Sequence, residues 1–433
     1  MIFDINKRIP FIFTTLIYLA ASSTSLALEL GDDTRQGIND PSFRSLQVTA
    51  NEDIMSIPVI TLGGNDRIVI SFDELGDDRR YMRYELIHCD ASWQPEGLVD
   101  SEFLDGFNEG MIDDYRYSEA TTVHYVNYHI TLPNEQVRFT VSGNYLVRVY
   151  PESDVDQTLL QARFSVVEPA ATLFADVSTR TDIDINDKHQ QVDIKIDVGD
   201  YPVEDLFNDL KVVVEQDGRS DNAVMVTQPL RLGGAGIAIY EHLRPLIFDA
   251  GNEYRRFETV SLSRPVMGVD LISYQEPYYH AELAVDSPRA GTMYLYDQTQ
   301  NGRYLIRESE SPNEDSDIYA DYLVTHFSLD MPEQTDYDIF IDGDLVNRRI
   351  DPTSLMTFNR ATGCYEKVLL LKQGHYNYQY IAVPRGGSMR GRTSVVEGDY
   401  APTTHQYTIK VYHRPRGTRF DRLIGVTTVL SGR

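Results

Sequence analysis

The residue pattern most suggestive of chemistry is a spaced acidic run, Asp182, Asp184 and Asn186, with Asp193 at its twelfth position. Calcium-binding loops use such a spacing because alternating oxygens can wrap around one hard cation. Here Asp187 stands where that loop requires glycine, and Asp193 replaces the bidentate glutamate. A strand pattern rather than a helix follows. We therefore expect a solvated turn and no metal site.

Three histidines, His88, His124 and His129, could meet near Asp90 on one face of a sheet. Such a group would suit a transition metal, because neutral imidazole is a common ligand. Isolated strand histidines more often hydrogen-bond to a backbone or hydroxyl partner. The sequence therefore predicts neither a metal nor a cofactor at these positions.

Two glycine-containing runs approach catalytic motifs without completing them. Residues 386–390 read GGSMR, and Arg390 stands where a nucleophile elbow needs glycine. Residues 233–236 read GGAG, but no helix pattern follows that would direct backbone amides at a phosphate. We predict no catalytic residue and interpret the protein as a non-enzyme.

The elements that would position these residues are strands. Apolar and polar residues alternate at Ile68–Phe72, Tyr84–His88, Val192–Val198 and Leu323–Leu329, which is typical of half-buried strands. Only residues 98–114 have helical character, and Gly106 and Gly110 weaken it. The expected fold class is all-β: two or three immunoglobulin-like/early-set β-sandwich domains in series, with little helix.

The length of the chain and the turn signals suggest three consecutive domains. We expect an N-terminal β-sandwich over residues 28–168, a middle one over 169–284 and a C-terminal early-set-like one over 285–433. Within the last domain, a strand running into Asp342-Gly343 predicts a hairpin at that point.

Residues 1–27 have the features of a secretory signal peptide. Lys7 and Arg8 precede the apolar stretch 11–21, and Ser25 and Ala27 are small residues suited to cleavage after Ala27. The apolar stretch is too short for a bilayer-spanning helix. We expect an exported chain that does not itself span a membrane.

The net charge of −27 is unevenly distributed. Such an acidic surface repels nucleic acid and anionic membranes. The segment from Arg385 onward is basic, and it includes Arg414, Arg416, Arg419 and Arg422. Two interpretations remain open: a solvated basic face, or a contact surface for an acidic partner or for the chain's own body.

The two cysteines, Cys89 and Cys364, leave two interpretations open. They could pair in an oxidising compartment. Alternatively, Cys89 is a small buried apolar group on a strand. Two cysteines are too few for a disulfide scaffold or a thiolate zinc site.

A loop of about 30 residues follows the strand that ends near Cys89, and loops of that length are usually functional or self-packed. It carries five apolar candidates for partner contact: Trp93, Leu98, Phe103, Leu104 and Phe107. Packing of the loop on its own sheet is the competing interpretation, and we favour it for Trp93 and Phe103.

Several ordered motifs in and after this loop resemble the plug proteins of the bacterial type IX secretion system. They are HCDASW (88–93), FLDGF (103–107), IDDY (112–115), LPN (132–134) and SGNY (142–145), followed by GNEYR (251–255), LKQGHYNYQY (371–380) and VYHRPRGTRFDRLIG (411–425). The resemblance lies in the ordered set, which covers most of the chain after residue 27.

The resemblance implies a non-enzymatic periplasmic protein that binds the outer-membrane translocon barrel of the type IX system and closes its periplasmic opening. The loop residues and the four tail arginines would then contact the barrel, and we expect a monomer apart from that partner. The alternative function is a periplasmic or cell-surface glycan-binding β-sandwich protein. It rests on the early-set analogy and on the alternating Tyr376, Tyr378 and Tyr380, which could also be cross-strand packing.

Overall fold

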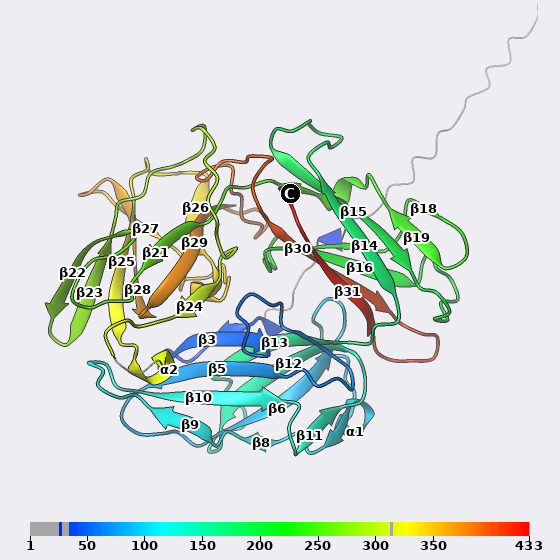
Figure 1. Ribbon diagram of the computed structural model, residues 1–433, viewed down its shortest axis with the longest axis horizontal. Coiled ribbons are helices and arrows are strands. Elements are labelled where there is room, and N and C mark those ends of the chain that lie inside the picture. Colours follow the sequence, from blue (N-terminus) through cyan, green and yellow to red (C-terminus); the bar gives the residue numbers. More distant parts are fainter. Residues whose placement is uncertain (1–25, 28–33, 312–314, 433) are drawn as a thin grey trace, which may run out of the picture.

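The computed structural model describes residues 26–27, 34–311 and 315–432 (Figure 1). Strands make up 46% of the described residues and helix 4%. Since soluble proteins average about 30–35% helix, the predicted all-β fold class is confirmed. The sheets form a series of sandwiches, which Figure 1 shows as three lobes. Most of the predicted signal peptide, residues 1–25, lies outside the described residues.

The first sandwich packs two main sheets around one apolar core. One sheet has the order β3 (Phe43–Ala50), β5 (Ile68–Leu75), β10 (Tyr125–Leu132), β9 (Asp114–Tyr117). The other has the order β2 (Gly37–Ile38), β13 (Leu160–Val167), β12 (Gly143–Pro151), β6 (Met82–Cys89), β8 (Gly110–Met111), and β4 (Val59–Thr61) pairs with β13. Short elements occupy the long loop: α1 (Asp100–Phe103), and β7 (Leu104–Gly106) paired with β11 (Val137–Phe139).

The middle sandwich combines residues from two distant parts of the chain. Its first sheet has the order β1 (Leu26–Ala27), β17 (Val224–Val226), β16 (Leu210–Gln216), β30 (Gln406–His413), β31 (Arg422–Leu430). Its second has the order β14 (Thr172–Ser178), β15 (His189–Asp197), β19 (Ile237–Tyr240), β18 (Arg231–Leu232), and β20 (Ile247–Asp249) pairs with β15. Alternate residues of β15, β16 and β30 are buried between the two sheets, as their period of two predicts.

The third sandwich lies between these two parts in sequence. One sheet has the order β21 (Arg255–Glu258), β29 (Gly374–Pro384), β24 (Tyr304–Ile306), and β26 (Tyr337–Asp342) also pairs with β29. The other has the order β22 (Val269–Gln275), β23 (Tyr278–Leu283), β25 (Tyr322–Leu329), β28 (Cys364–Lys372), β27 (Thr357–Asn359). The helical turns α2 (Ser316–Tyr319), η2 (Arg244–Leu246) and η3 (Asp344–Val346) are short. Tyr376, Tyr378 and Tyr380 of β29 are buried in the core, so they form no exposed platform.

The strand pairing differs from the predicted linear segments 169–284 and 285–433. β30 and β31 hydrogen-bond into the middle sandwich beside β16, and β21 to β23 belong to the third sandwich. The period of a strand shows that it is half-buried but does not identify the strand beside it. The predicted hairpin at Asp342-Gly343 is wrong, because Gly343 leads into η3 and β26 pairs with β29.

The first and third sandwiches meet through a buried polar contact that we call the weld: Asp73, Tyr322 and Lys372. Asp73 Oδ2 accepts hydrogen bonds from Lys372 Nζ and from the Tyr322 hydroxyl, both at 2.6 Å. The side chains of Asp73 and Lys372 are 1% and 2% exposed. Charges so deeply buried must be paired to be tolerated, so the weld fixes how these two sandwiches sit against each other.

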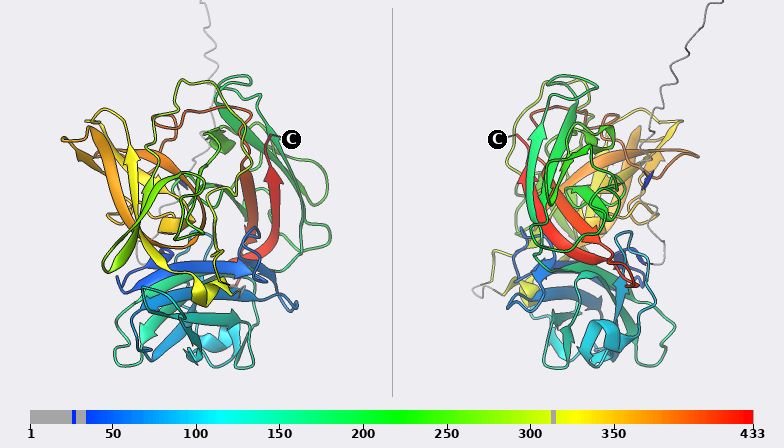
Figure 2. Two further views of the ribbon diagram at one scale, coloured as in Figure 1. Left: turned by 60° about the vertical axis from the view of Figure 1, so that its left-hand side comes forward. Right: turned by 90° about the vertical axis from the view of Figure 1, so that its right-hand side faces the viewer.

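The first and middle sandwiches meet on the outer face of β6, β12 and β13. Figure 2 shows β31, in red, running down to the first sandwich. Apolar side chains fill the contact: Ala91, Val213, Met225, Tyr412 and Leu423. Within the described ranges, no helix is long and apolar enough to cross a bilayer.

Candidate functional site

The long loop predicted to contact a partner begins at a tight turn that buries the only tryptophan. The carboxylate of Asp90 accepts hydrogen bonds from the backbone amides of Ser92 and Gln94 at 2.8 and 2.9 Å. Trp93 lies between them in the left-handed region, at a φ of 63°. This strained conformation turns the indole inward, where it is 6% exposed.

Trp93 packs where the first and middle sandwiches meet. It contacts the small cluster formed by Cys89 and Leu146 on the outer face of the sheet. The guanidinium of Arg163 lies 4.5 Å from the ring centre, and Lys410 Nζ of β30 lies 5.7 Å from it. Cation–π contacts of this kind are favourable when desolvated, so Trp93 ties the turn to both sandwiches.

The other apolar candidates of the loop separate into buried and exposed groups. Phe103 and Leu104 are buried in the first core, and Leu98 packs partly against it. Phe107 is 82% exposed. The loop therefore packs on its own sandwich, as we favoured for Trp93 and Phe103, and Phe107 alone among the five candidates points into solvent.

The four tail arginines all pair with carboxylates of this chain. Arg414 bridges Glu96 and Asp421, Arg416 pairs with Glu204, Arg419 with Glu102, and Arg422 with Glu168. We call the segment Arg414–Arg422, together with the loop carboxylates Glu96 and Glu102, the clamp. These ion pairs match the predicted contact with the chain's own acidic body, whereas contact of the same arginines with a partner stays a prediction.

Asp421 is the buried centre of the clamp. Its carboxylate is fully buried and accepts hydrogen bonds from Lys211 Nζ at 2.7 Å and from the Ala91 amide at 3.0 Å. Burial alone would raise the pKa of Asp421, but the charge of Lys211 and the hydrogen bonds from Ala91 and Arg414 lower it below its ordinary value. Glu96 is buried beside Asp421 at 4% exposure, whereas the outer arginines Arg416 and Arg419 are 72% and 62% exposed.

His88, His124 and His129 do not come together, and each has a separate partner. His88 is buried, with Nδ1 2.8 Å from Glu96 Oε2 and Nε2 3.2 Å from the Ser142 carbonyl oxygen. His124 lies beside Asp77, and His129 is 3.8 Å from Asp317. The acidic run is a turn between β14 and β15 in which Asp184 accepts from His189. Among the described residues, no group of three or more His, Cys, Asp or Glu side chains could hold a metal.

Both cysteines are free thiols. Cys89 is fully buried, as the apolar interpretation predicted, and this burial raises the pKa of its thiol to about 12. The thiolate, which is the reactive form, is therefore negligible at neutral pH.

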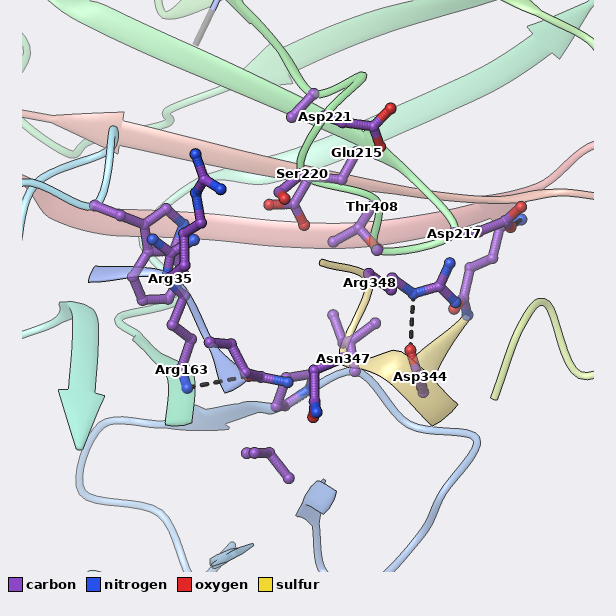
Figure 3. A pocket seen from close by; sticks show the side chains of 18 of the residues that line it. Arg35, Arg163, Glu215, Asp217, Ser220, Asp221, Asp344, Asn347, Arg348 and Thr408 are labelled. Carbon is purple, nitrogen blue, oxygen red and sulfur yellow. Dashed lines mark hydrogen bonds and ion pairs between the residues drawn. The ribbon is translucent and has the colours of Figure 1, made fainter. Parts of the chain in front are cut away.

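A cavity of about 1030 Å³ lies where the three sandwiches meet (Figure 3). In the figure Arg35 and Arg163 lie on one side, Asp344 and Arg348 on the other, and Glu215, Ser220 and Asp221 above. The wall also includes Trp93, Val224 of β17, Arg303, Arg390 and Lys410. The cavity is thus built from all three sandwiches and shares Trp93 with the turn of the long loop.

Comparison with known families decides the identity of the first sandwich. Residues 43–168 match the family model of the type 9 secretion system plug protein 1st domain. The first sandwich is therefore assigned to the type 9 secretion system plug protein 1st domain. The matched range begins at the first residue of β3 and ends just after β13, so it covers nearly all of the first sandwich.

A solved structure resembles this chain over almost its whole length. The crystal structure of a hypothetical protein from Parabacteroides merdae is 44% identical, with a TM-score of 0.90, over 92% of this chain and 99% of that chain. A partial N-terminal region of an enterococcal surface protein aligns over 94% of this chain and 99% of that chain, at 7% identity and a TM-score of 0.19, and carries no structural information. No curated protein matches this sequence.

Sequence reasoning missed the cavity between the three sandwiches. Arg163, Arg303 and Lys410 come from β13, from the segment before β24 and from β30, so no local spacing joins them. Arg163 did carry one signal: it is a charged residue at the centre of a strand whose neighbours on both sides are apolar, Ala162 and Phe164. A cation in such a run often has a buried partner or a site.

Proposed function

We propose that this chain is a non-enzymatic periplasmic plug that binds the outer-membrane translocon barrel of the type IX secretion system and closes its periplasmic opening. The observation that carries the proposal is the match of the first sandwich to the plug first domain. The mechanism is occupancy: a folded body fills the opening, and release requires that its contact with the barrel be broken.

The junctions of the molecule suit this mechanical role. A plug must not deform when the opening is under load, and a body of separate sandwiches on flexible linkers would deform. Here the weld joins the first and third sandwiches through a buried ion pair. Trp93 and the clamp join the first and middle sandwiches. These contacts hold the three sandwiches together as one rigid body.

We place the contact with the barrel on the exposed side of the long loop and the clamp. Phe107 offers a large apolar side chain that is 82% exposed, and aromatic residues and arginines are enriched among the residues that dominate binding energy. Arg416 and Arg419 lie in the clamp, each with an exposed guanidinium and a carboxylate partner that a competing carboxylate of the barrel could replace.

A pull-down from detergent-solubilised outer membrane tests the binding step. The chain beginning at Leu28, with an affinity tag, should capture the translocon barrel, identified by mass spectrometry. Phe107→Asp should abolish capture, while Phe174→Asp should not. Phe174 is a matched control because it is also an exposed phenylalanine, at 55%, but lies on β14 of the middle sandwich. Equal capture by both variants would refute the proposed face, and no barrel with the unmodified chain would refute the plug.

The closing step needs a separate measurement in cells. Deletion of the chain should leave barrels open and make the cells sensitive to a large antibiotic such as vancomycin, which an intact outer membrane excludes. The Phe107→Asp chain should fail to restore resistance and Phe174→Asp should restore it. Restoration by both variants, or no sensitivity on deletion, would contradict closure.

The glycan-binding alternative loses its one specific residue pattern. Tyr376, Tyr378 and Tyr380 are each less than 5% exposed, and the hydroxyl groups of Tyr378 and Tyr380 both donate to Asp286. They cannot present their rings to a sugar, so we do not pursue this alternative.

A further inference from the structure

The central cavity has a charge opposite to that of the molecule around it. Eight cationic side chains and four carboxylates line it, although the chain as a whole carries a net charge of −27. The cations are Arg35, Arg163, Arg244, Arg303, Arg348, Arg349, Arg390 and Lys410. A positive hollow in an acidic protein attracts anions and focuses them inward.

Several of these cations are held by neutral groups. Arg163 donates to the carbonyl and hydroxyl oxygens of Thr34 at 2.6 and 3.1 Å, and Arg303 donates to the Gln300 carbonyl and the Gln406 side chain. Neither they nor Arg390 have a carboxylate within ion-pair distance in the described part of the chain. Other lining cations do have one: Arg348 pairs with Asp344, and Lys410 with Glu215.

Arg163 is the most unusual of these cations. It is 9% exposed, stacks on Trp93 and lines the cavity, yet no carboxylate of the described residues lies within ion-pair distance of it. A buried cation is costly unless it is paired. The burial lowers its pKa to about 10, which still leaves it charged at neutral pH. Glu215 acts on Arg163 only from beyond ion-pair distance, so the guanidinium can still pair directly with a carboxylate that enters the cavity.

One wall of the cavity is a strand edge that already accepts an extended backbone. Val224 of β17 lines the cavity, and β17 pairs with β1 in antiparallel register, Leu26 with Met225 and Ala27 with Val224. β1 consists of the two residues that directly precede the cleavage site predicted after Ala27. On the mature chain β17 would be the edge of its sheet, with free backbone hydrogen-bonding groups facing the positive space.

We infer that the cavity of the mature chain binds an extended, acidic peptide segment of another protein. The segment adds a strand to the edge of β17, and the carboxylates on its cavity side pair with Arg163, Arg303 and Arg390. Backbone pairing supplies affinity and the alternate side chains supply specificity, as in other cases of strand addition. The volume of about 1030 Å³ is at the upper end for a ligand site and suits several residues. This inference depends on the cleavage site and not on the plug function.

The single tryptophan provides a direct readout, because Trp93 is the only one in the chain and lines the cavity. The chain beginning at Leu28 would be titrated with the peptide acetyl-Val-Glu-Val-Glu-Val-Glu-amide while Trp93 fluorescence is followed. The change should saturate and weaken with added salt. The glutamine counterpart of the peptide should bind about tenfold more weakly or not at all. Equal response to both peptides, or none up to about 1 mM, would overturn the inference.

Two arginines on one exposed segment form a matched pair of variants. Arg390→Gln should weaken the acidic peptide about tenfold, whereas Arg385→Gln should not, because Arg385 lies outside the cavity and pairs with Asp338. Both are exposed and neither is expected to affect folding. Arg303→Gln should repeat the effect of Arg390→Gln. Equal affinities for all three variants would refute the assigned contacts.

Two further titrations test the ligand class and the strand edge. Sodium glutamate should not reproduce the Trp93 signal at peptide concentrations, and if it did, the site would be one for small anions. A chain beginning at Ser25 retains β1, so it should bind the peptide more weakly than the chain beginning at Leu28. Equal binding by the two chains would exclude addition to β17.

Discussion

The first sandwich is attached to its neighbours by two contacts of opposite character. The weld to the third sandwich is dry, and its two charged side chains are at most 2% exposed. The clamp to the middle sandwich is buried at Asp421 and Glu96, and its outer arginines, Arg416 and Arg419, are mostly in solvent. Buried pairs are costly to break, whereas exposed ones are screened by salt and contribute little. The weld should therefore resist salt, whereas added salt or a binding partner should weaken the exposed ion pairs of the clamp.

The largest effect should follow from breaking the weld. Lys372→Met leaves Asp73 buried with only the Tyr322 hydroxyl and Asn127 amide as partners, so unfolding free energy should fall by about 3–5 kcal/mol. Urea unfolding followed by circular dichroism measures it. The double variant Asp73→Asn/Lys372→Met should recover part of the loss, because no unpaired charge remains. A double variant less stable than either single one would contradict this account.

Trp93→Ala should have a comparable or slightly smaller effect. It removes a ring that is 6% exposed and uncovers Arg163, so we expect a loss of about 3–5 kcal/mol and a lower melting temperature. Trp93→Phe keeps an aromatic face for the guanidinium and should lose less. An unchanged melting temperature in Trp93→Ala would mean that the turn does not join the two sandwiches.

Within the clamp, the buried ion pair of Asp421 should contribute more to stability than the exposed ion pair of Arg416. Arg414→Gln removes a partner of buried Asp421, which keeps Lys211 and the Ala91 amide, so a loss of about 1 kcal/mol is expected. Arg416→Gln removes only an exposed pair and should leave the urea midpoint unchanged. Repeating both at high salt should reduce the first difference. Equal losses of unfolding free energy in Arg414→Gln and Arg416→Gln would show that burial of Asp421 makes no difference.

The smallest effect concerns the junction of the middle and third sandwiches, where Asp217 accepts from Asn301 and lies beside His405. Burial alone would lower the pKa of His405, but the Asp217 carboxylate raises it above the ordinary value of 6.5. The stabilisation is therefore complete below pH 6.5 and is lost as pH rises through the raised pKa.

Urea midpoints across pH 5.5–9 measure this dependence. The chain should lose stability toward the alkaline end, and His405→Gln should show a flatter profile over the same range. Burial alone would raise the pKa of Asp217, but the charge of His405 and its hydrogen bond lower it below the ordinary value of 3.8. The stabilisation by the Asp217 carboxylate is therefore complete above pH 3.8 and is lost as the pH falls through the lowered pKa. Parallel profiles for the two chains would show that this junction does not depend on the charge of His405.

The sequence was sufficient to predict strands in which apolar and polar residues alternate. The alternation at residues 84–88, 192–198 and 323–329 correctly predicted β6, β15 and β25, because burial of one face requires it. The predicted loop after Cys89 packs on its own sandwich through apolar residues it carries. Its predicted extent was wrong, because β8 and β9 lie within it and pair with β6 and β10.

What required the structure are the contacts between distant segments. The tail arginines were visible as a basic run, but their ion-pair partners Glu96 and Glu102 lie more than 300 residues away. The cavity is formed by three sandwiches together, and Arg163 and Lys410 meet only across Trp93. Charge and hydrophobic period can be read from a short stretch of sequence. A contact between residues hundreds of positions apart cannot, because it depends on how the whole chain folds.

The position of β30 and β31 has a consequence for the order in which the molecule is completed. β16 pairs with β30, which begins nearly 200 residues later at Gln406. The whole third sandwich lies between the two strands in the sequence. During folding the first sandwich can close early, but the middle one stays open until β30 and β31 are available. Truncation near residue 405 should therefore leave a folded first sandwich attached to an unfinished, adhesive sheet. The rigid body therefore cannot form before the C-terminal strands β30 and β31 are available.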